Sequence, residues 1–146
     1  MVANTEHAGR SGCPVACAMD IFGDHWSLLV IRDLAFSGRH EYKDLLRAEE
    51  GISSNILSNR LRRLEDNGLI TALPHPGGRR RKLYYLTDRG KDLIPVLISI
   101  MRWSERHLGR IVKISPANRR LLTNDPDHMI RSALQELERW EKSVGI

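Results

Sequence analysis

Apolar residues recur along most of this chain at the spacing of amphipathic helices, and one short stretch alternates like a β-hairpin instead. The first helical pattern opens at Cys13-Pro14 and closes at Gly23. Proline suits the first helical position, so Cys13 is the predicted N-cap of a short helix. Asp24 can cap a second helix, which runs to Phe36 and is apolar on most sides. A helix of this kind is expected in the centre of a core.

The anchors of this second helix are expected to be Trp26 and the run Leu29 to Ile31. A shorter helix is predicted at about 41–48. The spacing of its apolar residues turns three side chains inward, namely Tyr42, Leu45 and Leu46.

The next helix forms a helix-turn-helix pattern with the short one, because only a few residues and a glycine join them. Ser53 is its predicted N-cap, and it stops at Gly68, the residue type that most easily takes the left-handed conformation after a helix. Leu57, Leu61 and Leu64 recur in one stripe that should face the core.

The opposite face of this helix is polar, with Asn55, Asn59 and Arg62 in one sector. Asparagine can pair bidentately with adenine and arginine with guanine in the major groove, whereas serine can contact either base or a phosphate. The residues expected to contact DNA from this helix are Ser53, Ser54, Asn55, Ser58, Asn59, Arg62 and Arg63. A merely solvated helix face is the alternative.

A hairpin is predicted after this helix, with strands at 69–73 and 81–86 around a turn rich in proline and glycine. Its tip and returning strand carry Arg79, Arg80, Arg81 and Lys82 in succession. Side chains alternate along a strand, so part of this run must meet solvent or phosphate. After a helix-turn-helix, the hairpin becomes a wing that grips the DNA backbone. Lys43, which faces outward on the short helix, is also expected to contact DNA. A solubilising turn is the alternative.

A long helix is predicted from Thr87 or Asp88 to about Val112, and Pro95 in its interior should kink it or leave a carbonyl unpaired. It carries more apolar surface than one small domain normally needs, which indicates a partner helix. The residues expected at a dimer contact are Leu97, Ile100, Met101, Trp103 and Leu108.

Two further helices are predicted to start at Ser115-Pro116 and Asp125-Pro126. The last is amphipathic, with a stripe formed by Met129, Ala133, Leu137, Trp140 and Val144. Packing on its own subunit and packing on a second copy are both open.

The fold class is therefore mainly α with a small β-hairpin wing, that is, a winged helix-turn-helix with a C-terminal helical extension. The length of 146 residues and 41% hydrophobic composition favour one domain of ordinary size. We expect a flexible tail at 1–12, a DNA-binding and dimerisation domain at 13–112 and the extension at 113–146. The absence of a signal peptide or membrane-length apolar run predicts a cytoplasmic protein.

The surplus positive charge of the chain lies in residues 39–91. This stretch holds 12 of the 23 lysines and arginines but 7 of the 18 acidic residues, and so accounts for the whole net charge of +5. A basic surplus on a helix-turn-helix pattern favours nucleic acid as the partner.

The chain resembles the HxlR family of winged-helix transcription regulators, which are related to MarR-type repressors. The resemblance runs from about 13 to 108. The matching pieces are Cys13-Pro14-Val15, the stretch from Gly23 to Leu34, Gly51-Ile52-Ser53, the stretch from Leu57 to Glu65, Asn67-Gly68-Leu69-Ile70 and the stretch from Tyr85 to Gly90.

The resemblance implies a bacterial homodimer that binds an inverted-repeat operator in double-stranded DNA and usually represses transcription. The dimer would pair through its first and long C-terminal helices. The chain departs from the family in continuing for more than 30 residues after the long helix and in having a more basic wing.

Cys13 is the candidate for chemistry. In several family members a cysteine just before this proline senses electrophiles, oxidants or aldehydes, so a small reactive effector is implied. A thiol at a helix N-terminus also feels the positive end of the helix dipole, which stabilises the thiolate. A small buried cysteine is the alternative.

The residues bear differently on three other classes of function. An enzyme is not expected, because no motif pairs a cysteine with a base and no phosphate loop is present. No cofactor is expected. A metal-responsive repressor using Cys13 and Cys17, with His7 or His25, stays open although the spacing differs from paired C-x-x-C sites. A winged-helix interaction module that never touches DNA also stays open.

Overall fold

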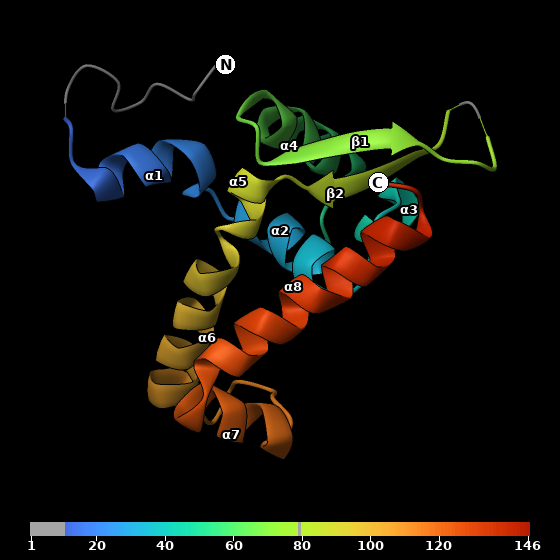
Figure 1. Ribbon diagram of the computed structural model, residues 1–146. Helices are drawn as coiled ribbons and strands as arrows, with labels where there is room; N and C mark the ends of the chain where they lie inside the picture. The colour runs from blue at the N-terminus through green and yellow to red at the C-terminus, as the bar shows by residue number, and fades with distance from the viewer. Residues whose placement is uncertain (1–10, 79) are drawn as a thin grey trace. The chain divides into compact units, whose positions relative to one another are not determined.

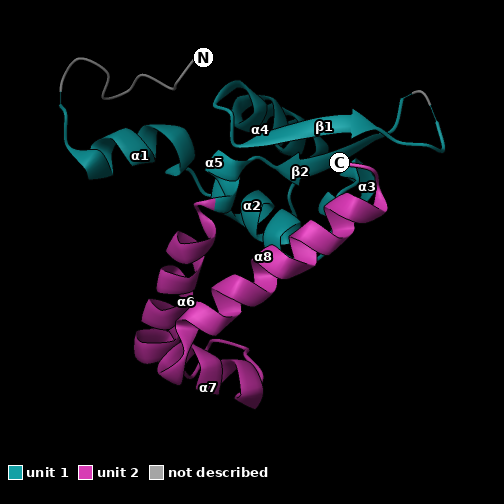
Figure 2. Ribbon diagram, in the orientation of Figure 1, with its two compact units in different colours: residues 1–91 teal, residues 92–146 magenta. Residues whose placement is uncertain are grey.

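The computed structural model describes residues 11–78 and 80–146 (Figure 1). The chain divides between Lys91 and Asp92 into two compact units, coloured separately in Figure 2. The first unit contains α1 (Pro14–Phe22), α2 (Ser27–Phe36), α3 (Tyr42–Leu45), α4 (Ser54–Asp66), β1 (Ile70–Pro74), β2 (Lys82–Leu86) and α5 (Asp88–Lys91). The second contains α6 (Ile94–Leu108), α7 (Pro116–Asn124) and α8 (Pro126–Ser143).

The first unit is a winged helix-turn-helix, as predicted. Helix α2 packs beside β2, and α4 packs beside β1. The largest side chains with almost no exposed area in this unit are Ile31, Leu34, Leu45, Leu57, Leu64, Ile70 and Leu86. The predicted stripe of α4 is confirmed, because Leu57, Leu61 and Leu64 are all buried.

The hairpin is antiparallel, with Ile70 opposite Leu86 and Pro74 opposite Lys82. The segment before α3 lies along β2, where the Tyr84 N–H donates to the His40 carbonyl oxygen at 2.7 Å. The same two residues make a second contact, because Nδ1 of the buried His40 ring lies 2.8 Å from the Tyr84 carbonyl oxygen. Because a carbonyl only accepts, Nδ1 carries the proton.

A close backbone approach fixes the chain after the hairpin. The Thr87 hydroxyl donates to the Gly68 carbonyl at 2.6 Å, and the Gly90 N–H donates to the Thr87 hydroxyl at 3.1 Å. A Cβ added at Gly90 would lie 2.0 Å from the Leu69 carbonyl oxygen. Only glycine fits this place without a backbone shift.

Two expected anchors are less buried than predicted. Trp26 and Leu29 are half-buried, whereas Val30, Ile31 and Leu34 form the buried face of α2. The Asp24 carboxylate accepts the N–H groups of Trp26 and Ser27, which leaves Trp26 at the edge of the helix.

The predicted inward position of Leu46 is also wrong. Helix α3 ends at Leu45 after about one turn, and Leu46 is exposed. Tyr42 is half-buried and Leu45 is buried.

The predicted single helix from residue 87 to 112 is two helices. Helix α5 ends at Lys91 and α6 starts at Ile94, which places Pro95 in the first turn of α6. Proline has no N–H and clashes with the preceding turn inside a helix, but a first-turn N–H has no partner to lose. The chain therefore breaks before Pro95 where a kink was expected.

In the second unit, α6, α7 and α8 pack against one another. Ser115 and Asp125 cap α7 and α8 as predicted, accepting from the N–H groups of Asn118 at 3.1 Å and His128 at 3.2 Å. Ala133 and Leu137 of the predicted α8 stripe are buried within the single chain. The sequence-based division at residue 112 stays a prediction, whereas the compact units divide before α6.

Over the described residues, no single helix is long and apolar enough to cross a membrane. Only the pair α1 and α2, bent by 78°, satisfies length and composition together.

Candidate nucleic-acid interface

Helix α4 is a well-bounded amphipathic helix. The Ser53 side chain accepts from the Ile56 N–H at 3.3 Å, which confirms the predicted cap. Gly68 follows the helix with a φ of +73°, a conformation that favours glycine. These two ends fix which residues of the helix face away from the core.

The polar face of α4 is exposed. Its exposed members are Ser53, Ser54, Asn55, Ser58, Asn59 and Arg62, and Arg63 is half-buried at the margin. The sector of α4 that the sequence predicted for base contacts is therefore not covered by other residues of the first unit. The structure brings these residues together on one helix, but their role in DNA binding stays a prediction.

Tyr42 of α3 supports this face, a contact that the sequence did not suggest. Its hydroxyl donates to the Ser54 carbonyl oxygen at 3.0 Å and lies 3.2 Å from the Ser58 hydroxyl oxygen. Tyr42 therefore fixes the angle between α3 and the start of α4. The Ser58 hydroxyl already has one protein partner.

Asp24 and Arg60 form a second support that the sequence analysis missed. The Arg60 Nε donates to Asp24 Oδ2 at 2.7 Å, and each side chain is 19% exposed. Partial burial raises the pKa of Asp24, but hydrogen bonds from Ser27, Arg60 and the Trp26 N–H outweigh it and lower the pKa from 3.8 to about 2. The carboxylate is consequently charged at neutral pH.

The wing carries exposed cations at Arg80, Arg81 and Lys82. Arg79, the fourth predicted contact, lies outside the described residues. Pro74 and Lys82 form the last pair of the ladder before the turn, so Arg80 and Arg81 lie in the turn and Lys82 starts β2.

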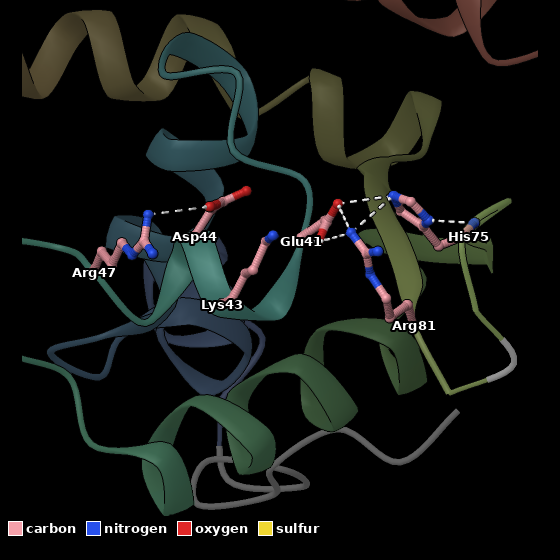
Figure 3. A network of polar contacts seen from close by, with 7 residues as sticks. Glu41, Lys43, Asp44, Arg47, His75 and Arg81 are labelled. Carbon is pink, nitrogen blue, oxygen red and sulfur yellow. Dashed lines mark hydrogen bonds and ion pairs between the residues drawn. The ribbon is translucent and has the colours of Figure 1, made fainter.

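Arg81 already has a protein partner. Its Nη2 lies 2.8 Å from both carboxylate oxygens of Glu41, and the His75 Nε2 lies 2.8 Å from Glu41 Oε1 (Figure 3). The His75 Nδ1 accepts from the Gly77 N–H at 2.7 Å, so a neutral ring donates from Nε2 to Glu41. Arg81 and His75 thus fasten the wing to the residue before α3.

The hydrogen bond from Arg81 is the main reason that the pKa of Glu41 lies below its usual range, and the charge of Lys43 adds to it. The Lys43 Nζ is 3.7 Å from Glu41 Oε2 and its side chain is 62% exposed. Lys43 is therefore available to a phosphate, whereas Arg81 would have to leave or share its carboxylate.

A hollow of about 360 Å³ lies between α3, α4 and β2. Arg62 and Lys82 line it together with the acidic Glu65 and Asp66. The groove beside α4 is therefore mixed in charge, and Arg80 lies outside it.

Cys13 is the N-cap of α1, as predicted. Its thiol is exposed, and its backbone is extended, with φ −61° and ψ 125°. The N–H groups of Ala16 and then Val15 lower the pKa of Cys13. Cys17 is also exposed, and its Sγ lies 3.9 Å from the Ser11 carbonyl oxygen.

Among the described residues, no group of three or more His, Cys, Asp or Glu side chains is placed to hold a metal ion. His7, which the metal-responsive alternative invoked, lies outside this part of the chain.

The apolar surface of α6 is only partly as expected. Ile100, Trp103 and Leu108 are 45%, 59% and 41% exposed, and Met101 is half-buried. Leu97 is buried within the single chain, which removes it from the predicted dimer surface. Val96 is also exposed, since it precedes Ile100 by one helical turn.

Comparison with known proteins identifies the family. The model of the HxlR-like helix-turn-helix family matches residues 21–112. An uncharacterised HTH-type transcriptional regulator of Synechocystis sp. is 38% identical over 100 residues, which cover 67% of this chain and 73% of that protein. A second such regulator, from Mycobacterium tuberculosis, is 35% identical over 99 residues, and the match spans only 61% of its length and 68% of this chain.

Solved structures agree with the sequence matches. The crystal structure of PA1607 superposes with a TM-score of 0.61 at 36% identity, covering 73% of this chain and 70% of that one. The redox regulator HypR in its oxidised form gives 0.55 at 26% identity, covering 65% of this chain and 97% of that one. These relatives are regulators and not enzymes. The chain belongs to the HxlR-like helix-turn-helix family of transcription regulators.

Proposed function

We propose that the protein is a homodimeric regulator that binds an inverted-repeat operator through α4 and its wing and represses transcription. The observation that carries this proposal is the exposed polar face of α4 beside a basic hairpin. The surplus charge supports it, since the residues from 39 to 91 account for the whole net charge. Such a surface can combine base contacts from α4 with backbone contacts from the wing.

The test compares Asn59→Ala and Arg80→Ala on operator and random DNA. Asn59→Ala should cost about 1 to 3 kcal/mol on the operator alone, whereas Arg80→Ala should weaken binding to both DNAs equally. Arg139→Ala is the matched control, because Arg139 is an exposed arginine of α8. Affinity that hardly changes with salt would contradict the proposal and favour a protein-interaction module.

The dimer part of the proposal rests on α6. Ile100 and Trp103 expose apolar surface at positions that lie about one turn apart, as on a helix that packs against a partner. Reading two half-sites requires the two α4 helices to lie about 34 to 36 Å apart. Binding-site selection should therefore return an inverted repeat.

Cys13 carries a second proposal, that a reactive compound releases the DNA. An electrophile would form a bond to the Cys13 thiolate, whereas an oxidant would take two electrons and two protons from the Cys13 thiols of two subunits to form a disulfide. The exposed, N-capping thiol with its lowered pKa supports this reactivity, and the similarity to the redox regulator HypR agrees with it.

Operator affinity before and after diamide or formaldehyde tests the sensing proposal. Cys13→Ser should remove the response, and Cys17→Ser, also at an exposed cysteine of α1, is the matched control. An equal response of Cys13→Ser and the parent protein would remove Cys13 from the mechanism.

A further inference from the structure

Arg60 joins two parts of the first unit through different nitrogens. Its Nε donates to Asp24 at 2.7 Å, and its Nη1 donates to Oδ1 of Asn59 at 2.5 Å. Asp24 stands in the connection between α1 and α2, whereas Asn59 is exposed on the predicted base-reading face of α4. One guanidinium therefore links the α1–α2 connection to that face.

The contact between Arg60 and Asn59 requires this support. Neighbouring residues on a helix point about 100° apart, so their side chains do not normally meet. Asp24 draws the guanidinium of Arg60 sideways, and its carboxylate is itself fixed by the Trp26 and Ser27 N–H groups at 2.9 and 3.0 Å. The planar guanidinium then offers Nη1 to Asn59 in a fixed direction.

We propose that Arg60 is a positioning residue that sets the orientation of the Asn59 amide and thereby the base that Asn59 selects. This proposal rests on the proposed function, because it concerns the choice of DNA sequence. With Oδ1 held by Arg60, the amide presents its Nδ2 hydrogens, so Asn59 approaches the DNA as a donor.

A donor distinguishes the base pairs in the major groove. Guanine presents two acceptors there, N7 and O6, whereas adenine presents one acceptor and one donor. The familiar bidentate pair of asparagine with adenine needs the amide oxygen as an acceptor from the base. The structure therefore favours guanine at the position that Asn59 contacts, in place of the adenine that its residue type suggests.

The experiment is selection from a DNA library with every operator position randomised, followed by sequencing of the bound fraction. The Asn59 position is identified as the one whose preference disappears in Asn59→Ala. The test variant is Arg60→Lys, because one ammonium can keep the ion pair with Asp24 but cannot also hold the Asn59 oxygen. Thermal unfolding of each variant establishes that the variant is folded.

The wild type is expected to select guanine at the Asn59 position, and Arg60→Lys to shift the ratio of guanine to adenine there by about tenfold towards adenine. Preferences at all other positions should stay unchanged. An adenine preference in the wild type, or superimposable profiles for the wild type and Arg60→Lys, would overturn the assignment.

The same selection experiment distinguishes a wrong role for Arg60 from a wrong proposed function. If the wild type enriches no sequence at all, the regulator proposal falls and the role of Arg60 falls with it. If the wild type enriches an operator but Arg60→Lys reads it identically, only the role of Arg60 is overturned. Arg139→Lys, the same change at an exposed arginine of α8 outside the predicted DNA surface, is the matched control, and it should leave the guanine preference unchanged.

Discussion

Helices α4 and α6 are both amphipathic, but they expose opposite kinds of surface. Helix α4 buries its leucines and presents serine, asparagine and arginine side chains. Helix α6 buries Leu97 and Ile98 yet still presents Ile100 and Trp103. A polar face can remain hydrated until DNA replaces the water, whereas an exposed tryptophan beside isoleucine is costly unless another protein surface covers it.

The comparison indicates a division of labour between the two units. Tyr42 and Asp24 contact α4 through Ser54 and Arg60, and these contacts fix polar groups of the helix in defined directions. The exposed apolar residues of α6 need only area and shape to associate. A substitution should therefore affect DNA sequence preference at α4 and assembly at α6.

The largest effect is expected from a charge on α6. Ile100→Asp should convert a dimer to a monomer, because an aspartate would be buried without a partner at the subunit contact. Operator affinity should then fall about 100-fold or more, since the two half-sites are no longer bound by one linked molecule. Sedimentation and fluorescence anisotropy measure both effects.

The matched control for this change is Gln135→Asp, which adds the same charge at an exposed position of α8. It should leave the protein dimeric. A persistent dimer with Ile100→Asp would show that the apolar face of α6 has another role.

The buried side of α4 gives the next largest effect. Leu57→Ala should lower the free energy of unfolding by about 2 to 5 kcal/mol, because Leu57 has no exposed area and a cavity would remain. Leu46→Ala removes the same atoms from an exposed position and should cost less than about 0.5 kcal/mol. If urea unfolding gave the two variants equal losses of unfolding free energy, the buried position of Leu57 and the exposed position of Leu46 would be contradicted.

The contact between Asp24 and Arg60 of α4 should make the free energy of unfolding depend on pH. Its pKa is lowered from 3.8 to about 2, so its stabilisation is complete above pH 3.8 and is lost as the pH falls through about 2. Asp24→Asn should cost about 1 to 2 kcal/mol at pH 7, allowing for solvent screening, and this cost should disappear as the pH falls through about 2 to about 1.

Unfolding measured from pH 5 to pH 1 checks this prediction, with Asp92→Asn as a control at an exposed carboxylate. A difference between the wild type and Asp24→Asn that persists unchanged at pH 1 would refute the ionic origin of the stabilisation.

The smallest effect is expected at the wing. Arg80→Ala should reduce the slope of log affinity against log salt by about 1, because one phosphate contact is lost. Arg81→Ala should reduce it less, since Arg81 is already paired with Glu41. Glu41→Gln should release Arg81 and raise affinity for any DNA several-fold. If Arg80→Ala and Arg81→Ala gave equal slopes of log affinity against log salt, Arg81 would have to leave Glu41 and contact a phosphate when DNA binds.

The local elements could be predicted because their signals are local. Pro14, Ser53, Gly68 and Asp125 mark helix ends through their own backbone preferences, and the spacing of leucines in α4 fixes its buried face. The break before α6 was also encoded locally, in Pro95. The apolar pattern continues across it, which led the sequence analysis to place the proline inside one helix.

The sequence alone thus determined the fold class, the polar face of α4 and the basic wing, because periodicity and turn chemistry act over a few residues. Only the tertiary structure decided which charged groups are free. Glu41 pairs with Arg81 and Asp24 with Arg60 across separations of 40 and 36 residues. No periodic pattern reports such pairs, because they form only after packing brings distant segments together.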